Sequence, residues 1–148
     1  MAINDDIVLL KKFNFFSKMT TEQLQLLVFG AERKSFKSGN MIFKEGEPSQ
    51  SAYVILSGTV NLYRQNNLVQ PIHIINNSAL LDELALITEV NHHFTAIVQS
   101  DSKVLEVSRV VFLRLIAEFP EITQYIYDYV CERVLELANK VDHLPDFR

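Results

Sequence analysis

The chain has 148 residues, the size of one domain, and its 48% hydrophobic and 22% charged residues are the balance of a folded globular protein. A formal net charge of −4, without a cluster of Lys and Arg, argues against direct binding to nucleic acid. The single cysteine, Cys131, excludes an internal disulfide. No stretch reaches the roughly 18 apolar residues of a membrane span, and acids precede the first short apolar run. We therefore expect a soluble, cytoplasmic protein.

Helices are expected first along the chain. Apolar residues recur at helical spacing from Ile7 to Phe13. Thr20 is followed three residues later by Gln23, which is the spacing of a capping box, where each side chain bonds the backbone N–H of the other residue. Gly30 is a residue that can end a helix. The pattern predicts two short helices before the first strand.

Short segments rich in Val, Ile, Tyr and Phe follow the helices and are separated by turn residues. We expect strands at 32–36, 40–43, 51–56, 59–64, 68–75, 94–99 and 103–107. A brief helix is expected at 82–88, followed by a solvated polar loop that carries His92 and His93. Many short strands at regular spacing are typical of a sandwich or a jelly-roll barrel.

The carboxyl-terminal part is predicted to be helical. A helix is expected at 109–118, and Pro120 fits the first turn of the next one, where its missing N–H costs nothing. That last helix carries an apolar stripe formed by Ile122, Ile126, Val130, Val134, Leu137 and Val141. The stripe either packs on the barrel of its own domain or pairs with the helix of a second copy. Its length favours dimerisation.

Several short patterns occur in the order that they have in cyclic-nucleotide-binding domains. They are Gly39-x-x-Ile42, Glu45-Gly46, Tyr53-x-Ile55, Gly58-x-Val60 and the segment 78–98. Together they make the chain resemble this family over nearly its whole length. The resemblance implies one mainly β domain over 1–148 with flanking helices: an eight-stranded jelly-roll barrel (a double-stranded β-helix) at 31–108, amino-terminal helices at 1–30 and carboxyl-terminal helices at 109–148. It also implies that the final helix shifts or dimerises in response to ligand.

The resemblance places the ligand site in a cassette at 78–100. Glu83 matches the glutamate that binds the ribose 2′-hydroxyl, and the residues after it match the short helix that offers backbone N–H groups to the phosphate. Thr95 and Ala96 match the small residues beside the phosphate. The candidate ligand-binding residues are Asp82, Glu83, Leu84, Ala85, Phe94, Thr95 and Ala96.

Two departures from the family pattern fall where the negative phosphate would lie. Asp82 replaces a glycine that lets the backbone approach the ligand, and Phe94 replaces the arginine that pairs with the phosphate. Losing that charged hydrogen bond removes roughly 1.5–3 kcal/mol, or about one to two decades of affinity. A carboxylate beside the phosphate adds like-charge repulsion. Cyclic AMP and cyclic GMP are therefore disfavoured as ligands, and no other cofactor is indicated.

Three functions remain open. The chain is a sensor of a smaller or less charged molecule, a pocket-filled module that acts on a protein partner or a second copy through its last helix, or a genuine cyclic-nucleotide receptor that uses Thr95, the helix amides and His93. No nucleophile–base pair, metal cluster or phosphate-cradling loop indicates an enzyme.

The cassette residues also have purely structural interpretations. Asp82 is expected to cap the short helix, where its carboxylate would mimic a bound phosphate. Phe94 is expected in the core, where it would plug the pocket. Glu83 is either a surviving ligand residue or an acid that stabilises the first turn of the helix. Adjacent histidines point in different directions and suit no single metal ion.

Overall fold

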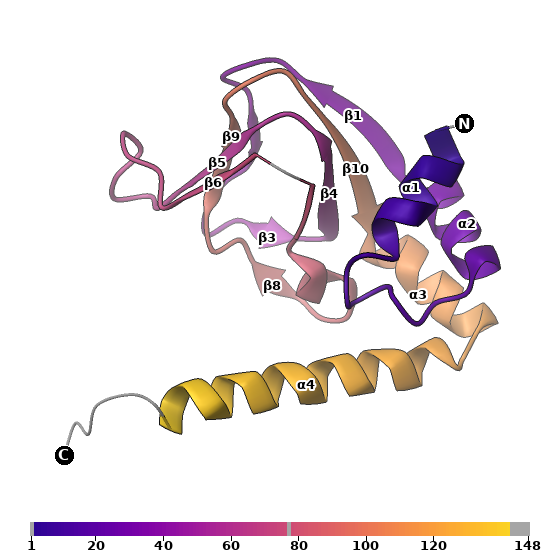
Figure 1. Ribbon diagram of the computed structural model, residues 1–148. Coiled ribbons are helices and arrows are strands. Elements are labelled where there is room, and N and C mark those ends of the chain that lie inside the picture. Colours follow the sequence, from indigo (N-terminus) through magenta and orange to yellow (C-terminus); the bar gives the residue numbers. More distant parts are fainter. Residues whose placement is uncertain (1, 77, 143–148) are drawn as a thin grey trace.

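The structure is a computed structural model that describes residues 2–76 and 78–142. It shows a β barrel with three short helices gathered at one end and one long helix running beneath it (Figure 1). The helices are α1 (Ala2–Leu10), α2 (Thr21–Gly30), α3 (Arg109–Glu118) and α4 (Ile122–Asp142). This arrangement confirms the prediction of a mainly β fold with helices at both ends.

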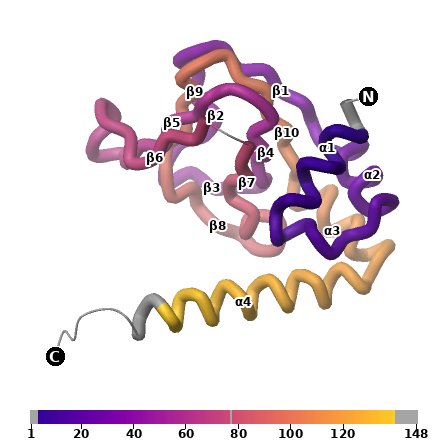
Figure 2. Tube along the Cα trace, in the orientation of Figure 1, coloured from indigo at the N-terminus to yellow at the C-terminus, as the bar shows by residue number. Residues whose placement is uncertain are grey.

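The strands are short. Their bounds are β1 Glu32–Phe36, β2 Met41–Phe43, β3 Pro48–Ser49, β4 Ser51–Ser57, β5 Val60–Tyr63, β6 His73–Ile75, β7 Ala79–Leu81, β8 Val90–Asn91, β9 Thr95–Val98 and β10 Ser102–Ser108. Among the described residues they form two four-stranded antiparallel sheets, β1-β10-β4-β7 and β2-β9-β5-β6, and a separate pair, β3-β8. Figure 2 shows β7 beside β4 at the edge of the first sheet. The two larger sheets supply the eight strands expected of the jelly roll.

The segment 68–75 is the part of the barrel where the strand prediction was wrong. Only β6 is a strand there, because the side chain of Asn67 accepts the backbone N–H groups of Val69 and Gln70 at 3.0 and 3.2 Å and folds the chain into a turn. Pro71 follows and has no N–H to donate to a ladder. The three strands β3, β7 and β8, each of two or three residues, were not predicted.

The core consists of two apolar clusters on opposite faces of β4. One lies between the first sheet and the helices and includes Val54, Phe16 and Phe112. The other fills the barrel between the two sheets and includes Ile55 and Val60. Because side chains alternate along a strand, neighbouring residues of β4 enter different clusters. The strand is a wall shared by the barrel and the helical layer.

The amino-terminal helices pack as their sequence predicts. The Thr20–Gln23 capping box forms, with N–H···O distances of 3.1 and 2.9 Å in its two directions. Helix α2 ends at Gly30, and a Cβ built at that position would lie 2.8 Å from Cγ1 of Val111. The glycine therefore allows α2 to approach α3 closely. This contact joins α2 to α3 within the helical layer.

Helix α4 starts two residues after Pro120, which lies in the preceding turn and not in the first turn as predicted. Its apolar stripe has two different surroundings. Ile122 is fully buried, whereas Val134 and Leu137 are both 57% exposed. The domain thus covers the beginning of the stripe and leaves the described later part open. Val141 lies outside the residues whose side chains are described.

Candidate ligand-binding site

Asp82 introduces the cassette helix in an unusual backbone conformation. The 3-10 helix η1 (Glu83–Leu86) follows it, and its own φ and ψ are 61° and 37°, in the left-handed region. Within 2–76 and 78–142 it is the one non-glycine residue with positive φ. Glycine adopts this conformation without steric cost, and Asp is among the few other residues that tolerate it. The backbone at Asp82 therefore has a conformation that a glycine would adopt without strain.

The side chain of Asp82 does not cap η1, so that part of the prediction was wrong. An N-cap residue that bonds the helix N–H groups has an extended backbone, and the left-handed backbone of Asp82 directs its carboxylate elsewhere. Its Oδ2 contacts Nδ1 of His92. The carboxylate therefore does not occupy the phosphate position on the helix amides.

His92 is buried, which contradicts the prediction of a solvated loop. Its ring stacks on Phe43 with centroids 4.2 Å apart and planes 6° from parallel, while its neighbour His93 is exposed. Through His92, Asp82 joins the start of η1 to the segment that follows β8. The burial depends on partners from β2 and from the cassette start, which the local sequence does not reveal.

Glu83 connects the cassette to α4. Its Oε1 accepts a hydrogen bond of 2.8 Å from the hydroxyl of Tyr129, and Nη1 of Arg133 lies 3.3 Å from the same oxygen. Burial, and then the hydrogen bond to Glu83, raises the pKa of Tyr129 to about 12, so the hydroxyl stays protonated and remains a donor. Glu83 is therefore more than an acid in the first turn of η1.

The residues at the other end of the cassette have structural contacts. Phe94 is half-buried, with the guanidinium of Arg64 located 5.4 Å from its ring centroid. Thr95 is fully buried, and its Oγ1 accepts the backbone N–H of Glu45 at 3.0 Å. Ala96 is buried in the barrel cluster. Strand β9 thus uses its small residues to close the barrel.

A pocket of about 310 Å³ lies between the cassette, the barrel and α4. Seven of its lining residues are apolar: Phe43, Leu62, Leu80, Leu81, Leu84, Val90 and Phe94. The others are Asp82, Glu83, Asn91, His93 and Arg133. Its volume is at the lower end of the roughly 300–1,000 Å³ typical of small-molecule sites. Phe94 forms part of the wall of this pocket and does not fill it, contrary to the expectation that its ring would plug the site.

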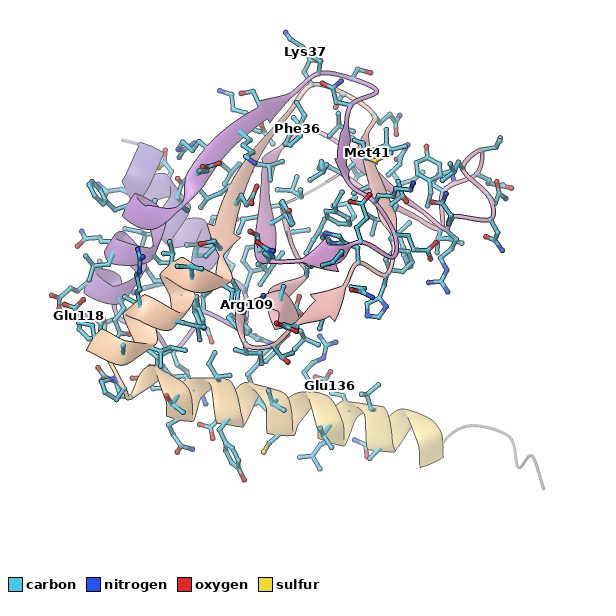
Figure 3. All side chains as sticks on the ribbon, turned by 180° about the vertical axis from the view of Figure 1, so that it is seen from behind. Phe36, Lys37, Met41, Arg109, Glu118 and Glu136 are labelled. Atoms are coloured by element: carbon cyan, nitrogen blue, oxygen red, sulfur yellow. The ribbon has the colours of Figure 1, made fainter. Side chains whose placement is uncertain are left out.

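The pocket brings together only part of the predicted site. It includes Asp82, Glu83, Leu84 and Phe94, whereas Ala85, Thr95 and Ala96 are not among its lining residues. Ala85 is buried, and its carbonyl oxygen accepts a hydrogen bond of 3.0 Å from Arg109. Arg109 lies at the start of α3 (Figure 3). Sequence reasoning missed Arg133, although its spacing of four residues from Tyr129 places both on one face of α4.

Two further findings concern the chemistry of the described residues. No group of three or more His, Cys, Asp and Glu side chains is arranged to hold a metal ion within 2–76 and 78–142. Over the same residues, none of the helices is both long and apolar enough to cross a membrane.

Comparison with known proteins identifies the family. The family model of the cyclic nucleotide-binding domain matches residues 33–119, more than half of the chain, and the chain belongs to this family. The match ends before α4, so it includes Glu83 but neither Tyr129 nor Arg133.

Individual proteins support the same conclusion. The chain is 24% identical over 131 residues to the cyclic AMP receptor protein of Thermus thermophilus, covering 87% of this chain but only 61% of that protein. A cyclic nucleotide-binding-like protein from Brucella abortus is 34% identical, with a TM-score of 0.71 and coverage of 76% of this chain and 98% of that one. The N-terminal domain of a transcriptional regulator from Streptomyces coelicolor has the same fold, with a TM-score of 0.83, 20% identity and coverage of 94% and 99%.

Proposed function

We propose that this chain is a regulatory sensor domain that detects a small molecule in the cassette pocket and reports it through α4. The observation that carries the proposal is the contact of Glu83 with Tyr129 and Arg133. Glu83 lines the pocket and α4 holds its carboxylate, so a ligand that engages Glu83 competes directly with the helix. Occupancy of the pocket is thereby linked to the position of α4.

The ligand is not a tightly bound cyclic nucleotide. The phosphate side of the pocket presents the ring of Phe94 and the carboxylate of Asp82, neither of which attracts an anion. On the sugar side, Glu83 already accepts hydrogen bonds from α4, and a ribose hydroxyl would have to replace them. Both effects lower affinity for cyclic AMP and cyclic GMP relative to a cassette with glycine and arginine.

The output passes from α4 to a second copy or another protein partner. The exposed apolar side chains of α4 (Val134, Leu135 and Leu137) form a surface suited to pairing with another helix. We place this regulatory, non-enzymatic role in the cytoplasm. Its regulatory character is supported by two similar proteins, a cyclic AMP receptor protein and a domain of a transcriptional regulator. In this proposal the chain itself does not contact nucleic acid.

Titration calorimetry with cyclic AMP and cyclic GMP tests the proposal. Wild type should show no binding at micromolar concentrations, whereas the double variant Asp82→Gly with Phe94→Arg should gain about one to two decades of affinity, because it restores the charged hydrogen bond. The matched control is Asp82→Gly with Phe94→Met, which restores the glycine without a cation. Micromolar binding by wild type contradicts the proposal, and a well-folded double variant that gains nothing contradicts the cassette alignment.

A further inference from the structure

The apolar part of the pocket restricts the shape of its ligand. Rings and branched side chains from β2, β5, β7, η1 and the segment before β9 surround a space of about 310 Å³. A ligand gains affinity here by burying an apolar body about the size of a substituted aromatic ring, since small-molecule sites are mostly apolar with few polar groups. The polar groups of the lining then decide which charge that ligand carries.

The ionisable groups of the lining favour a positive charge. Two carboxylates, those of Asp82 and Glu83, face one guanidinium, that of Arg133, and the imidazole of His93. Asp82 uses Oδ2 for His92, and Glu83 uses Oε1 for both of its partners on α4. Within residues 2–76 and 78–142, Asp82 Oδ1 and Glu83 Oε2 accept no hydrogen bond and therefore remain available as acceptors. An ammonium group has three N–H donors to match them, whereas an anion would meet like charge.

Arg133 already acts as a cation at this position. Its Nη1 lies 3.3 Å from Glu83 and 3.3 Å from the hydroxyl oxygen of Tyr129, and its side chain is 48% exposed. Its guanidinium lies 5.9 Å from the ring centroid of Tyr129. The Arg133 side of this ion pair is half-exposed, so solvent weakens the pair and a competing cation can replace Arg133. The guanidinium of Arg133 therefore occupies the position beside Glu83 that the cationic group of a ligand would take.

We propose that the ligand is a small organic cation with an apolar body, of the amine class, and that it displaces Arg133 from Glu83. The inference rests on the proposed function, because it names the ligand of the same pocket. The ammonium group binds Glu83 and Asp82, while the apolar body packs against Phe43 and Phe94, whose aromatic faces also attract cations. Loss of the Arg133 contact removes one of the two bonds that hold Glu83 to α4.

Three probes of similar shape test the charge: phenethylammonium, phenethyl alcohol and phenylpropionate, titrated into the full chain and followed by NMR. The cation should bind more tightly than the alcohol, and the alcohol more tightly than the anion. Glu83→Gln should weaken phenethylammonium binding about tenfold or more, because a charge-assisted hydrogen bond is lost. Arg133→Ala should strengthen it about two- to fivefold, because the internal competitor is removed.

Arg114→Ala is the matched control, because it removes the same charge from an exposed position on α3. It should leave all three affinities unchanged, and thermal unfolding checks that every variant is folded. Tighter binding of phenylpropionate, weaker cation binding by Arg133→Ala, or no binding of any probe overturns the cation inference. The proposed function fails separately, when wild type binds cyclic AMP or cyclic GMP at micromolar concentrations.

Discussion

The two halves of α4 have different surroundings although they carry one continuous apolar stripe. The first half contributes Ile122 and Ile126 to the core and Tyr129 to the contact with Glu83. The second half presents Val134 and Leu137 to solvent. The difference shows that the spacing of apolar residues identifies the apolar face of a helix, but not whether the same domain or a partner buries that face. In this chain the buried half fixes the helix to its domain, and the exposed half is left open to solvent.

The largest expected effect is on stability and compares one residue from each half. Ile122→Ala should lower the free energy of unfolding by about 2–5 kcal/mol, because it removes a fully buried side chain and leaves a cavity. Leu137→Ala should change it by less than about 0.5 kcal/mol, because that side chain is mostly exposed. Urea unfolding at low protein concentration measures both. Equal losses would mean that the two halves are equally covered.

The next effect concerns self-association through the exposed half. The double variant Val134→Glu with Leu137→Glu should weaken association of two copies by about tenfold or more, since it places charge in the apolar contact. Light scattering during size exclusion measures it. Val110→Glu, at an exposed position on α3, is the control and should leave association unchanged. A wild type that stays monomeric at high concentration would contradict pairing through α4.

The smallest effect concerns the hydrogen bond at the boundary between the halves. Tyr129→Phe should lower the free energy of unfolding by about 1 kcal/mol, the usual contribution of one hydrogen bond. Tyr127→Phe, at an exposed position on the same helix, is the control and should have no measurable effect.

The contribution of Tyr129 should also depend on pH. Its pKa in the folded chain, about 12, lies above that of an unfolded tyrosine near 10, so its stabilisation is complete below about pH 10 and is lost as pH rises through about 12. A spectrophotometric titration should show one fewer late-titrating phenol in Tyr129→Phe than in wild type. Loss of an early-titrating phenol, near pH 10, would place the hydroxyl in solvent.

Local sequence patterns predicted most of the fold. The Thr20–Gln23 box and the end of α2 at Gly30 depend on near neighbours in the chain. The main barrel strands were indicated by short runs of β-branched and aromatic residues between turn residues. The short strands β3 and β8 were not predicted, because a segment of two residues is too short to show a periodic pattern. They form by pairing with each other.

The candidate site was harder to predict because its contacts join distant segments. The family pattern predicted Asp82 and Glu83 as cassette residues, and both line the pocket. Their partners come from elsewhere: His92 is buried against Phe43, and Arg133 approaches Glu83 from a helix 50 positions further along the chain. No local pattern specifies a contact of that range. Thr95 has a hydroxyl that could bind a ligand, but in the structure this hydroxyl accepts the backbone N–H of Glu45 within the barrel.

The position of Tyr129 and Arg133 beyond residue 119 has a consequence for how such a sensor can evolve. The barrel that shapes the pocket and the side chains that hold Glu83 belong to different stretches of sequence. In the proposed sensor, substitutions at these two positions would shift the ligand concentration at which α4 responds, while the sequence of the barrel stays unchanged. Sensitivity could thus diverge between relatives that share one barrel.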